Sequence, residues 1–220
     1  MYIAEAHTQV DYELKTTDSI SYALNKMSEL HTHQLPVVDQ HSFLGIIQEE
    51  QLLDAIDEDA SLASLSMHFR FLYLYGDQHI YDALQFMTAH HLDILPVLDK
   101  DNHYVGILTA NSLLPQLNEI LGNNEPGAII VLELGKNDVS FSHIAHLIES
   151  ENTRIISTAV REIADSTKVE MTIKVNKQNI ASLVASLWRF DYTVTATFND
   201  GNPDTDIKER YDILMNYLNL

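Results

Sequence analysis

Hydrophobic positions in the first half of the chain follow the same order twice, sixty residues apart. Ile20 aligns with Ile80 and Met27 with Met87, and the segment Leu35–Val37 aligns with a second Leu-Pro-Val. After one inserted residue, Gly45-Ile46 aligns with Gly106-Ile107. The sequence therefore contains an internal duplication, in which each copy is expected to form one supersecondary unit.

Within each copy the spacing of apolar residues predicts strand, helix, strand, strand and helix (βαββα). In the first copy, apolar residues from Ile20 to Leu30 recur at helical spacing after Asp18, a predicted N-cap. The other elements predicted there are a short strand through Val10, Tyr12 and Leu14, strands Leu35–Val38 and Phe43–Ile47, and a helix over about Glu49–Ile56. In the second copy they are a strand over Phe69–Tyr75, a helix from Ile80, strands Ile94–Leu98 and Tyr104–Leu108, and a helix over Asn111–Leu121. Neither small sheet could bury both faces alone, so the copies are expected to pack together.

The second half of the chain has a βαββαβ pattern, the ferredoxin-like plan. Asp138 is the predicted cap of its first helix. The predicted strands are Ala128–Leu134, Thr153–Arg161, Val169–Val175 and Tyr192–Phe198, with helices around Phe141–Ile148 and Ile180–Leu187. Residues 201–220 are predicted to form a C-terminal amphipathic helix. The fold class is therefore α+β, with boundaries predicted at 1–60, 61–122, 127–200 and 201–220.

Composition limits the classes of protein that fit. Forty-five per cent of the 220 residues are hydrophobic, which excludes disorder, and the absence of cysteine excludes disulfides and thiol nucleophiles. The N-terminus lacks signal-peptide features and no apolar run is long enough to span a membrane. These features predict a cytoplasmic protein.

The formal net charge of −19 argues against nucleic acid and anionic membranes as partners. Residues 1–122 contain 18 acidic and 4 basic side chains, whereas residues 123–220 contain 14 and 9. This shift supports a boundary in the turn-rich stretch Leu121–Pro126.

No catalytic or nucleotide motif stands out: the sequence contains no Gly-x-Ser-x-Gly, His-Glu-x-x-His, P-loop or dinucleotide fingerprint. A non-enzymatic protein is expected. His143 and His146 share a helix face but lack an evident third ligand, so no metal site is predicted. Asp99–Asn102 is interpreted as a turn rather than a calcium loop. The aromatic residues of Phe69–Tyr75 could stack a base, but sheet core or a dimer contact is favoured.

The duplicated half resembles a tandem pair of cystathionine β-synthase (CBS) domains, through its Leu-Pro-Val-x-Asp and Gly-Ile segments. The βαββαβ half looks like an ACT domain, and the layout resembles acetoin-utilisation-type bacterial CBS-ACT proteins. The resemblance implies a homodimer with adenosyl ligands, such as AMP, ATP or S-adenosylmethionine, in clefts between the repeats.

The family's Gly-h-h-[Ser/Thr]-x-x-Asp segment, where h is hydrophobic, implies the ligand residues. Its hydroxyl contacts phosphate and its Asp holds the ribose. The second repeat keeps Gly106 and Thr109 but has Ser112 at the Asp position, and with Leu95 and Pro96 it forms the favoured cleft. The first repeat has Gln48 and Gln51 at the two polar positions and is the degenerate cleft. For Thr109, a helix cap is the favoured alternative to a phosphate contact.

The ACT resemblance implies an amino-acid site in the loop that contains Asn137, Asp138 and Ser140. Together these features predict a non-catalytic regulatory module, in which a CBS pair senses a small ligand and an ACT-like domain dimerises or senses a metabolite. The alternative is a protein-interaction and oligomerisation scaffold with degenerate ligand sites.

Overall fold

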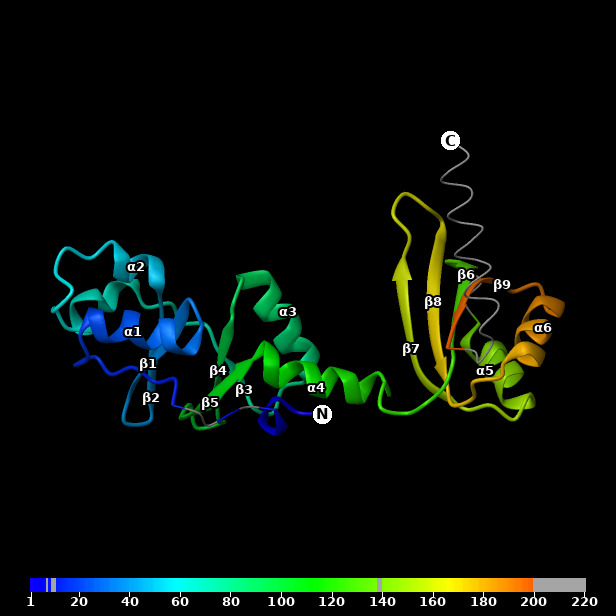
Figure 1. Cartoon of the computed structure of the whole chain (residues 1–220), viewed down its shortest axis with the longest axis horizontal. Coiled ribbons are helices and arrows are strands. Elements are labelled where there is room, and N and C mark those ends of the chain that lie inside the picture. Colours follow the sequence, from blue (N-terminus) through cyan, green and yellow to red (C-terminus); the bar gives the residue numbers. More distant parts are fainter. Residues whose placement is uncertain (7, 9–10, 138–139, 200–220) are drawn as a thin grey trace. The chain divides into compact units, whose positions relative to one another are not determined.

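The computed structural model describes residues 1–6, 8, 11–137 and 140–199 (Figure 1). The chain folds as two compact units, the first covering Met1–Leu117 and the second beginning at Asn118. The first unit contains both repeats, and the second contains the βαββαβ segment. The predicted C-terminal helix lies outside the described residues.

The first repeat forms α1 (Ile20–Leu30), β1 (Gln34–Asp39), β2 (Ser42–Gln48) and α2 (Glu49–Leu53), with β1 and β2 antiparallel. The prediction for the α1 cap was wrong by one residue. Ser19 is the N-cap and its Oγ accepts a hydrogen bond from the Tyr22 amide, whereas the Asp18 carboxylate accepts from the Lys15 amide. Helix α2 is also shorter than predicted.

The second repeat forms β3 (Leu74–Tyr75), α3 (Ile80–His90), β4 (Ile94–Leu98), β5 (Tyr104–Thr109) and α4 (Ala110–Ile120). The duplication extends to backbone detail. His31 and His91 end α1 and α3 in the left-handed conformation, at φ of 51° and 52°. Both hairpins contain an irregularity after equivalent valines, Val37 and Val97.

The leading strands are shorter than predicted. Of the described residues in these two leading strands, only Leu14 and β3 pair with a strand of their own repeat. Both pairings are parallel: Leu14 pairs with Val37, and Leu74 of β3 pairs with Val97. Val10 lies outside the described residues. The rest of the predicted strand Phe69–Tyr75 does not join the sheet of the second repeat, because Arg70 pairs instead with Ile46 in the first repeat.

The two repeats exchange these leading segments, as their need for mutual burial predicts. Arg70, which precedes the second repeat, exchanges two backbone hydrogen bonds with Ile46 of β2, at 2.8 and 2.9 Å. Thr8, which precedes the first repeat, does the same with Ile107 of β5, at 2.8 and 3.2 Å. Each repeat therefore completes the edge of the other.

The second unit contains β6 (Ile129–Gly135), α5 (Phe141–Ser150), β7 (Ile155–Glu162), β8 (Lys168–Val175), α6 (Ala181–Arg189) and β9 (Thr193–Phe198). The antiparallel sheet has the order β7-β8-β6-β9, which confirms the ferredoxin-like plan. Both helices lie on one face of the sheet (Figure 1). The N-cap position of α5 is Ser140, and the predicted cap Asp138 lies outside the described residues.

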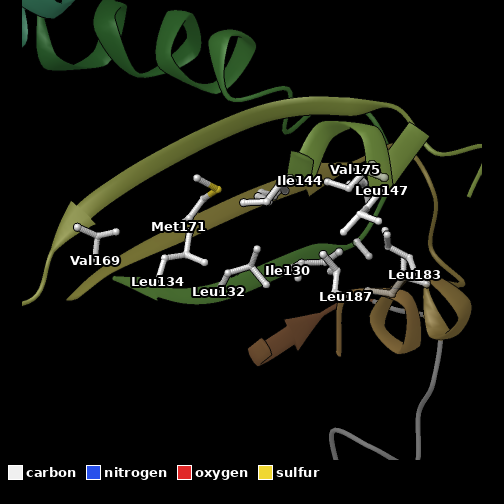
Figure 2. Packing of buried hydrophobic residues seen from close by; sticks show 14 residues of the cluster. Ile130, Leu132, Leu134, Ile144, Leu147, Val169, Met171, Val175, Leu183 and Leu187 are labelled. Carbon is white, nitrogen blue, oxygen red and sulfur yellow. The ribbon is translucent and has the colours of Figure 1, made fainter. Parts of the chain in front are cut away.

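The core of the second unit fills the space between this sheet and its two helices (Figure 2). Alternate residues of β6 and β8, including Leu132 and Met171, meet Ile144 of α5 and Leu187 of α6, and all four side chains are buried. Gly127, just before β6, is closely packed: a Cβ there would lie 1.8 Å from the Val175 carbonyl oxygen. The first repeat has a separate core around Leu14, Ile20, Leu35 and Ile47.

Candidate functional site

The residues predicted for the favoured cleft come together on one hairpin and the helix that follows it. Pro96 of β4 pairs with Ile107 of β5, and Gly106 lies opposite Val97. Thr109 ends β5 immediately before α4, and Leu95 is completely buried. The structure thus places Thr109 and Ser112 at the point where a strand meets a helix N-terminus.

Thr109 and Ser112 cap α4 reciprocally. The Thr109 Oγ1 accepts from the Ser112 amide at 3.1 Å, while the Ser112 Oγ accepts from the Thr109 amide at 2.9 Å. The Ser112 hydroxyl also donates to the Thr109 carbonyl at 3.0 Å, which uses its single proton. The cap uses the Thr109 hydroxyl only as an acceptor, so its O–H can still donate to a ligand oxygen.

The equivalent residues of the first repeat form the same local structure with longer side chains. The Gln51 Oε1 accepts from the Gln48 amide at 3.0 Å, and the Gln51 Nε2 lies 3.5 Å from the Gln48 Oε1. Gln48 and Gln51 therefore lie at the start of α2 as Thr109 and Ser112 lie at the start of α4.

Sequence reasoning missed Gln34, the first residue of β1. Its side chain is buried, with 4% of the residue exposed, and its Nε2 donates to the His91 carbonyl of the other repeat at 2.8 Å. Its Oε1 is buried and has no hydrogen-bond partner in the described part of the chain. The sequence does contain a sign of this buried glutamine. Gln34 directly precedes the fully apolar stretch Leu35–Val38, and the equivalent residue of the second repeat is Ile94.

His33 links the same region to both repeats. Its backbone amide donates to the Asp93 carboxylate at 3.2 Å, and its Nδ1 lies 2.6 Å from the Glu49 Oε2. The hydrogen bond with Glu49, and then the negative charges of Glu49 and Asp93, raise the pKa of His33 above its usual value. Two carboxylates thus contact His33, one through its backbone amide and one through its ring.

The aromatic residues before the second repeat form a cluster with both hairpins. The Phe43 ring of β2 meets Phe71 and Tyr73 edge-on at 5.7 and 5.9 Å, and stacks on Tyr104 of β5 at 6.4 Å. Burial, followed by the nearby carboxylates of Glu13 and Asp11, raises the pKa of Tyr104. Phe43 and Tyr104 are buried but Phe71 is largely exposed, so the cluster is part core and part surface.

A cavity of about 530 Å³ lies along α1 beside Asp11, Tyr22 and Lys26, away from the predicted site residues. The Lys26 ammonium donates to the Asp11 Oδ1 at 2.9 Å and to the Glu13 carbonyl at 2.7 Å. Its charge is therefore already engaged within the fold.

Three potential metal-ligating side chains gather in the turn between β4 and β5. Ligand atoms of Asp99, Asp101 and His103 lie within 4.8 Å of one another. The Asp99 Oδ1 accepts the amides of Asp101 and His103, and these bonds lower the pKa of Asp99 despite an opposing desolvation effect. The carboxylate thereby stabilises the turn that the sequence predicted.

The predicted ACT loop is only partly described. Asn137 is an exposed turn residue, Asp138 lies outside the described residues, and Ser140 Oγ lies 3.5 Å from Ser142 Oγ. The nearby His143 Nδ1 hydrogen-bonds to the Tyr192 hydroxyl at 2.7 Å. The geometry thus gives His143 a partner within its own domain.

Comparison with known proteins identifies the first half of the chain. Residues 12–58 and 62–119 match the family model "CBS domain", so this part of the chain is a CBS domain pair. An uncharacterised protein from Methanocaldococcus jannaschii is 29% identical over 87 residues, which are 40% of this chain and 29% of that protein. The chain therefore spans less than a third of the length of this curated relative.

The fold is also similar to several solved structures. A CBS domain pair/ACT domain protein from Thermotoga maritima is 24% identical, with a TM-score of 0.49 over 55% of this chain and 99% of that one. The acetoin utilization protein AcuB from Vibrio cholerae is 20% identical, with 0.48 over 56% and 95%. CBSX2, solved in complex with AMP, is 21% identical, with 0.46 over 54% and 97%.

The family match confirms the predicted CBS pair, and the observed helices and sheets confirm the α+β fold. Proteins with CBS domain pairs are typically regulatory, ligand-binding and non-catalytic, and often dimeric. Among the described residues, no helix is long and apolar enough to cross a membrane.

Proposed function

We propose that this chain is a non-catalytic regulatory module in which the CBS pair senses an adenosine derivative. The observation that carries the proposal is the geometry of Thr109, at a strand end and a helix N-terminus, with a hydroxyl donor that the cap does not use. AMP, ATP and S-adenosylmethionine are the candidate ligands. The signal would be a population shift, since a ligand favours the arrangement that it binds better.

The ACT-like domain is proposed to couple this binding to assembly or to a second metabolite. A homodimer would allow ligand binding in one protomer to change how the two CBS pairs meet. Light scattering of the full chain is expected to give twice the monomer mass of 25.0 kDa. A monomer at all concentrations would contradict this part of the proposal.

Thermal unfolding with AMP, ATP, S-adenosylmethionine and amino acids tests ligand binding, because a ligand that binds the folded state raises its stability. At a concentration of 100 times Kd, the stabilisation is about 2.7 kcal/mol. A melting temperature unmoved by every adenosyl compound would refute the proposed function.

Restoring the carboxylate of the CBS motif at position 112 tests where the adenosyl ligand binds. Ser112→Asp keeps a side-chain acceptor for the Thr109 amide and supplies a carboxylate for the ribose hydroxyls, so we expect about tenfold tighter adenosyl binding. Gln51→Asp is the matched control, because the first repeat has Gln48 in place of the threonine. An equal gain in both variants would argue against the special role of Thr109.

The second candidate function is an interaction scaffold, which exposed apolar side chains favour. Leu53 of α2 and Leu114 of α4 occupy equivalent positions in the two repeats and are 66% and 61% exposed. Affinity capture with the wild type and with a Leu53→Ser/Leu114→Ser double variant tests this function. Failure to capture any partner, together with clear ligand binding, would remove it.

A further inference from the structure

The cavity beside α1 shares no residue with the two predicted CBS clefts, and the proposed function does not use it. Its volume of about 530 Å³ is typical of sites that bind small molecules. The lining includes Asp11, from the segment that leads into the first repeat, and Tyr22, Lys26 and Glu29 of α1. The cavity therefore combines an aromatic ring with three ionisable side chains.

Lys26 is a buried part of the cavity wall, with only 9% of the residue exposed. Its ammonium donates to the Asp11 Oδ1 at 2.9 Å and to the Glu13 carbonyl at 2.7 Å. The same ammonium lies 5.9 Å from the centre of the Tyr22 ring. The lysine thus holds the Asp11 carboxylate at the cavity, and that carboxylate balances the charge of the lysine.

Glu29 adds a negative charge that the fold leaves unbalanced. Among the described residues, no basic side chain forms an ion pair with Glu29, and the last turn of α1 contains no basic residue. A carboxylate is unfavourable there, because the C-terminus of a helix carries partial negative charge. Asp11, Lys26 and Glu29 together carry one net negative charge, which a bound monocation would balance.

The charged groups of the cavity are specific to the first repeat. Helices α1 and α3 have the same length and bury apolar residues at the same positions. The lining differs, since Phe86 and Ala89 of α3 are equivalent to Lys26 and Glu29. The fold of a repeat therefore does not require these charges.

We propose that the cavity beside α1 binds an organic monocation, a primary amine with an apolar body. The ammonium group of the ligand donates to the carboxylates of Asp11 and Glu29. Its apolar body lies against Leu30 and the Tyr22 ring, whose face also attracts positive charge. This inference goes beyond the proposed function, because the ligand class and the residues differ from those of the Thr109 cleft.

Isothermal titration of the full-length protein with benzylamine tests the proposal, and benzyl alcohol is the matched uncharged probe. Benzylamine should bind with one-to-one stoichiometry. Benzyl alcohol should bind about tenfold more weakly, because it lacks the charge that the two carboxylates recognise. Glu29→Gln keeps the shape of the side chain but removes its charge, and should weaken benzylamine binding about tenfold.

Glu50→Gln is the matched control variant, since Glu50 lies in α2 of the same repeat and does not line the cavity. General attraction of a cation to this acidic chain would be weakened equally by the two substitutions. Glu50→Gln should instead retain wild-type affinity for benzylamine. Circular dichroism of each variant confirms that the fold is intact.

Three outcomes would overturn the inference: no binding of benzylamine to the wild type, equal affinity for benzylamine and benzyl alcohol, or equal losses in Glu29→Gln and Glu50→Gln. The proposed function is tested by separate titrations with adenosyl compounds. Either proposal can therefore fail while the other survives.

Discussion

At the scale of single residues, His33 and Gln34 follow each other in the sequence but lie in opposite surroundings. The His33 side chain is 77% exposed and contacts Glu49, while Gln34 is buried. Because neighbouring strand residues project to opposite faces, one position can respond to solvent while the next faces the interior. His33 and Gln34 are therefore tested by separate experiments.

The raised pKa of His33 depends first on its hydrogen bond with Glu49. A pKa above the unfolded value of about 6.5 means that the interaction stabilises the fold fully below that pH. The contribution disappears as pH rises through the raised folded-state value. Glu49→Gln is expected to lower the His33 pKa toward 6.5, as measured by NMR titration of its ring protons.

Glu50→Gln is the control for this titration, since Glu50 also lies in the first turn of α2 but does not bond to His33. It should move the His33 pKa much less than Glu49→Gln. Equal shifts would mean that general charge around the helix, rather than the direct contact, sets the pKa.

Gln34→Ile should also change stability in the absence of ligand. The substitution removes a buried acceptor that has no partner, and we expect stabilisation by about 1 kcal/mol in urea denaturation of ligand-free protein. Destabilisation by the same amount would show that the Gln34–His91 bond outweighs the unpaired oxygen.

At the scale of secondary-structure elements, sequence periodicity predicted the helices and most strands because their apolar faces are continuous. It failed where contacts between repeats decide the structure. Phe69–Tyr75 alternates like a strand, yet only Leu74–Tyr75 joins the sheet, since Arg70 pairs with the other repeat. Gln34 was missed for a similar reason, because its buried bond to His91 spans 57 residues. Short-range patterns do not encode such contacts.

The start of β6 provides a prediction at this scale. In Gly127→Ala, the new Cβ would lie 1.8 Å from the Val175 carbonyl oxygen, so β6 and β8 would have to separate locally. We expect a loss of about 3 kcal/mol or more in the second unit. Trp188 on α6 is the chain's single tryptophan, and its fluorescence follows this unit during denaturation.

Gly76→Ala is the matched glycine substitution. Its nearest contact would be the Ala4 Cβ at 3.2 Å, so the Ala4 backbone would have to move by only a few tenths of an ångström. The cost should be about 1 kcal/mol and should leave the Trp188 transition unchanged. A comparable loss at both glycines would contradict the special packing at Gly127.

At the scale of the whole molecule, the chain has separate hydrophobic cores in its two units. Leu35→Ala removes a completely buried side chain of the first repeat and should cost the first unit roughly 2–5 kcal/mol. Circular dichroism should then show an earlier transition, while Trp188 fluorescence keeps its wild-type midpoint. If both midpoints moved together, the two units would unfold as one cooperative system.

The exchange of leading segments between the repeats has a consequence for the ancestry of the fold. A single copy would leave Ile46 without the strand partner that Arg70 supplies, and a second identical molecule could supply it. An ancestral one-repeat gene could thus have encoded the same architecture as a symmetric pair. Symmetry forces the same residue onto both sides of the axis, whereas fusion frees each side to mutate alone. Gln34 and Ile94 occupy equivalent positions in the two repeats. Only the fused gene allows these two residues to differ.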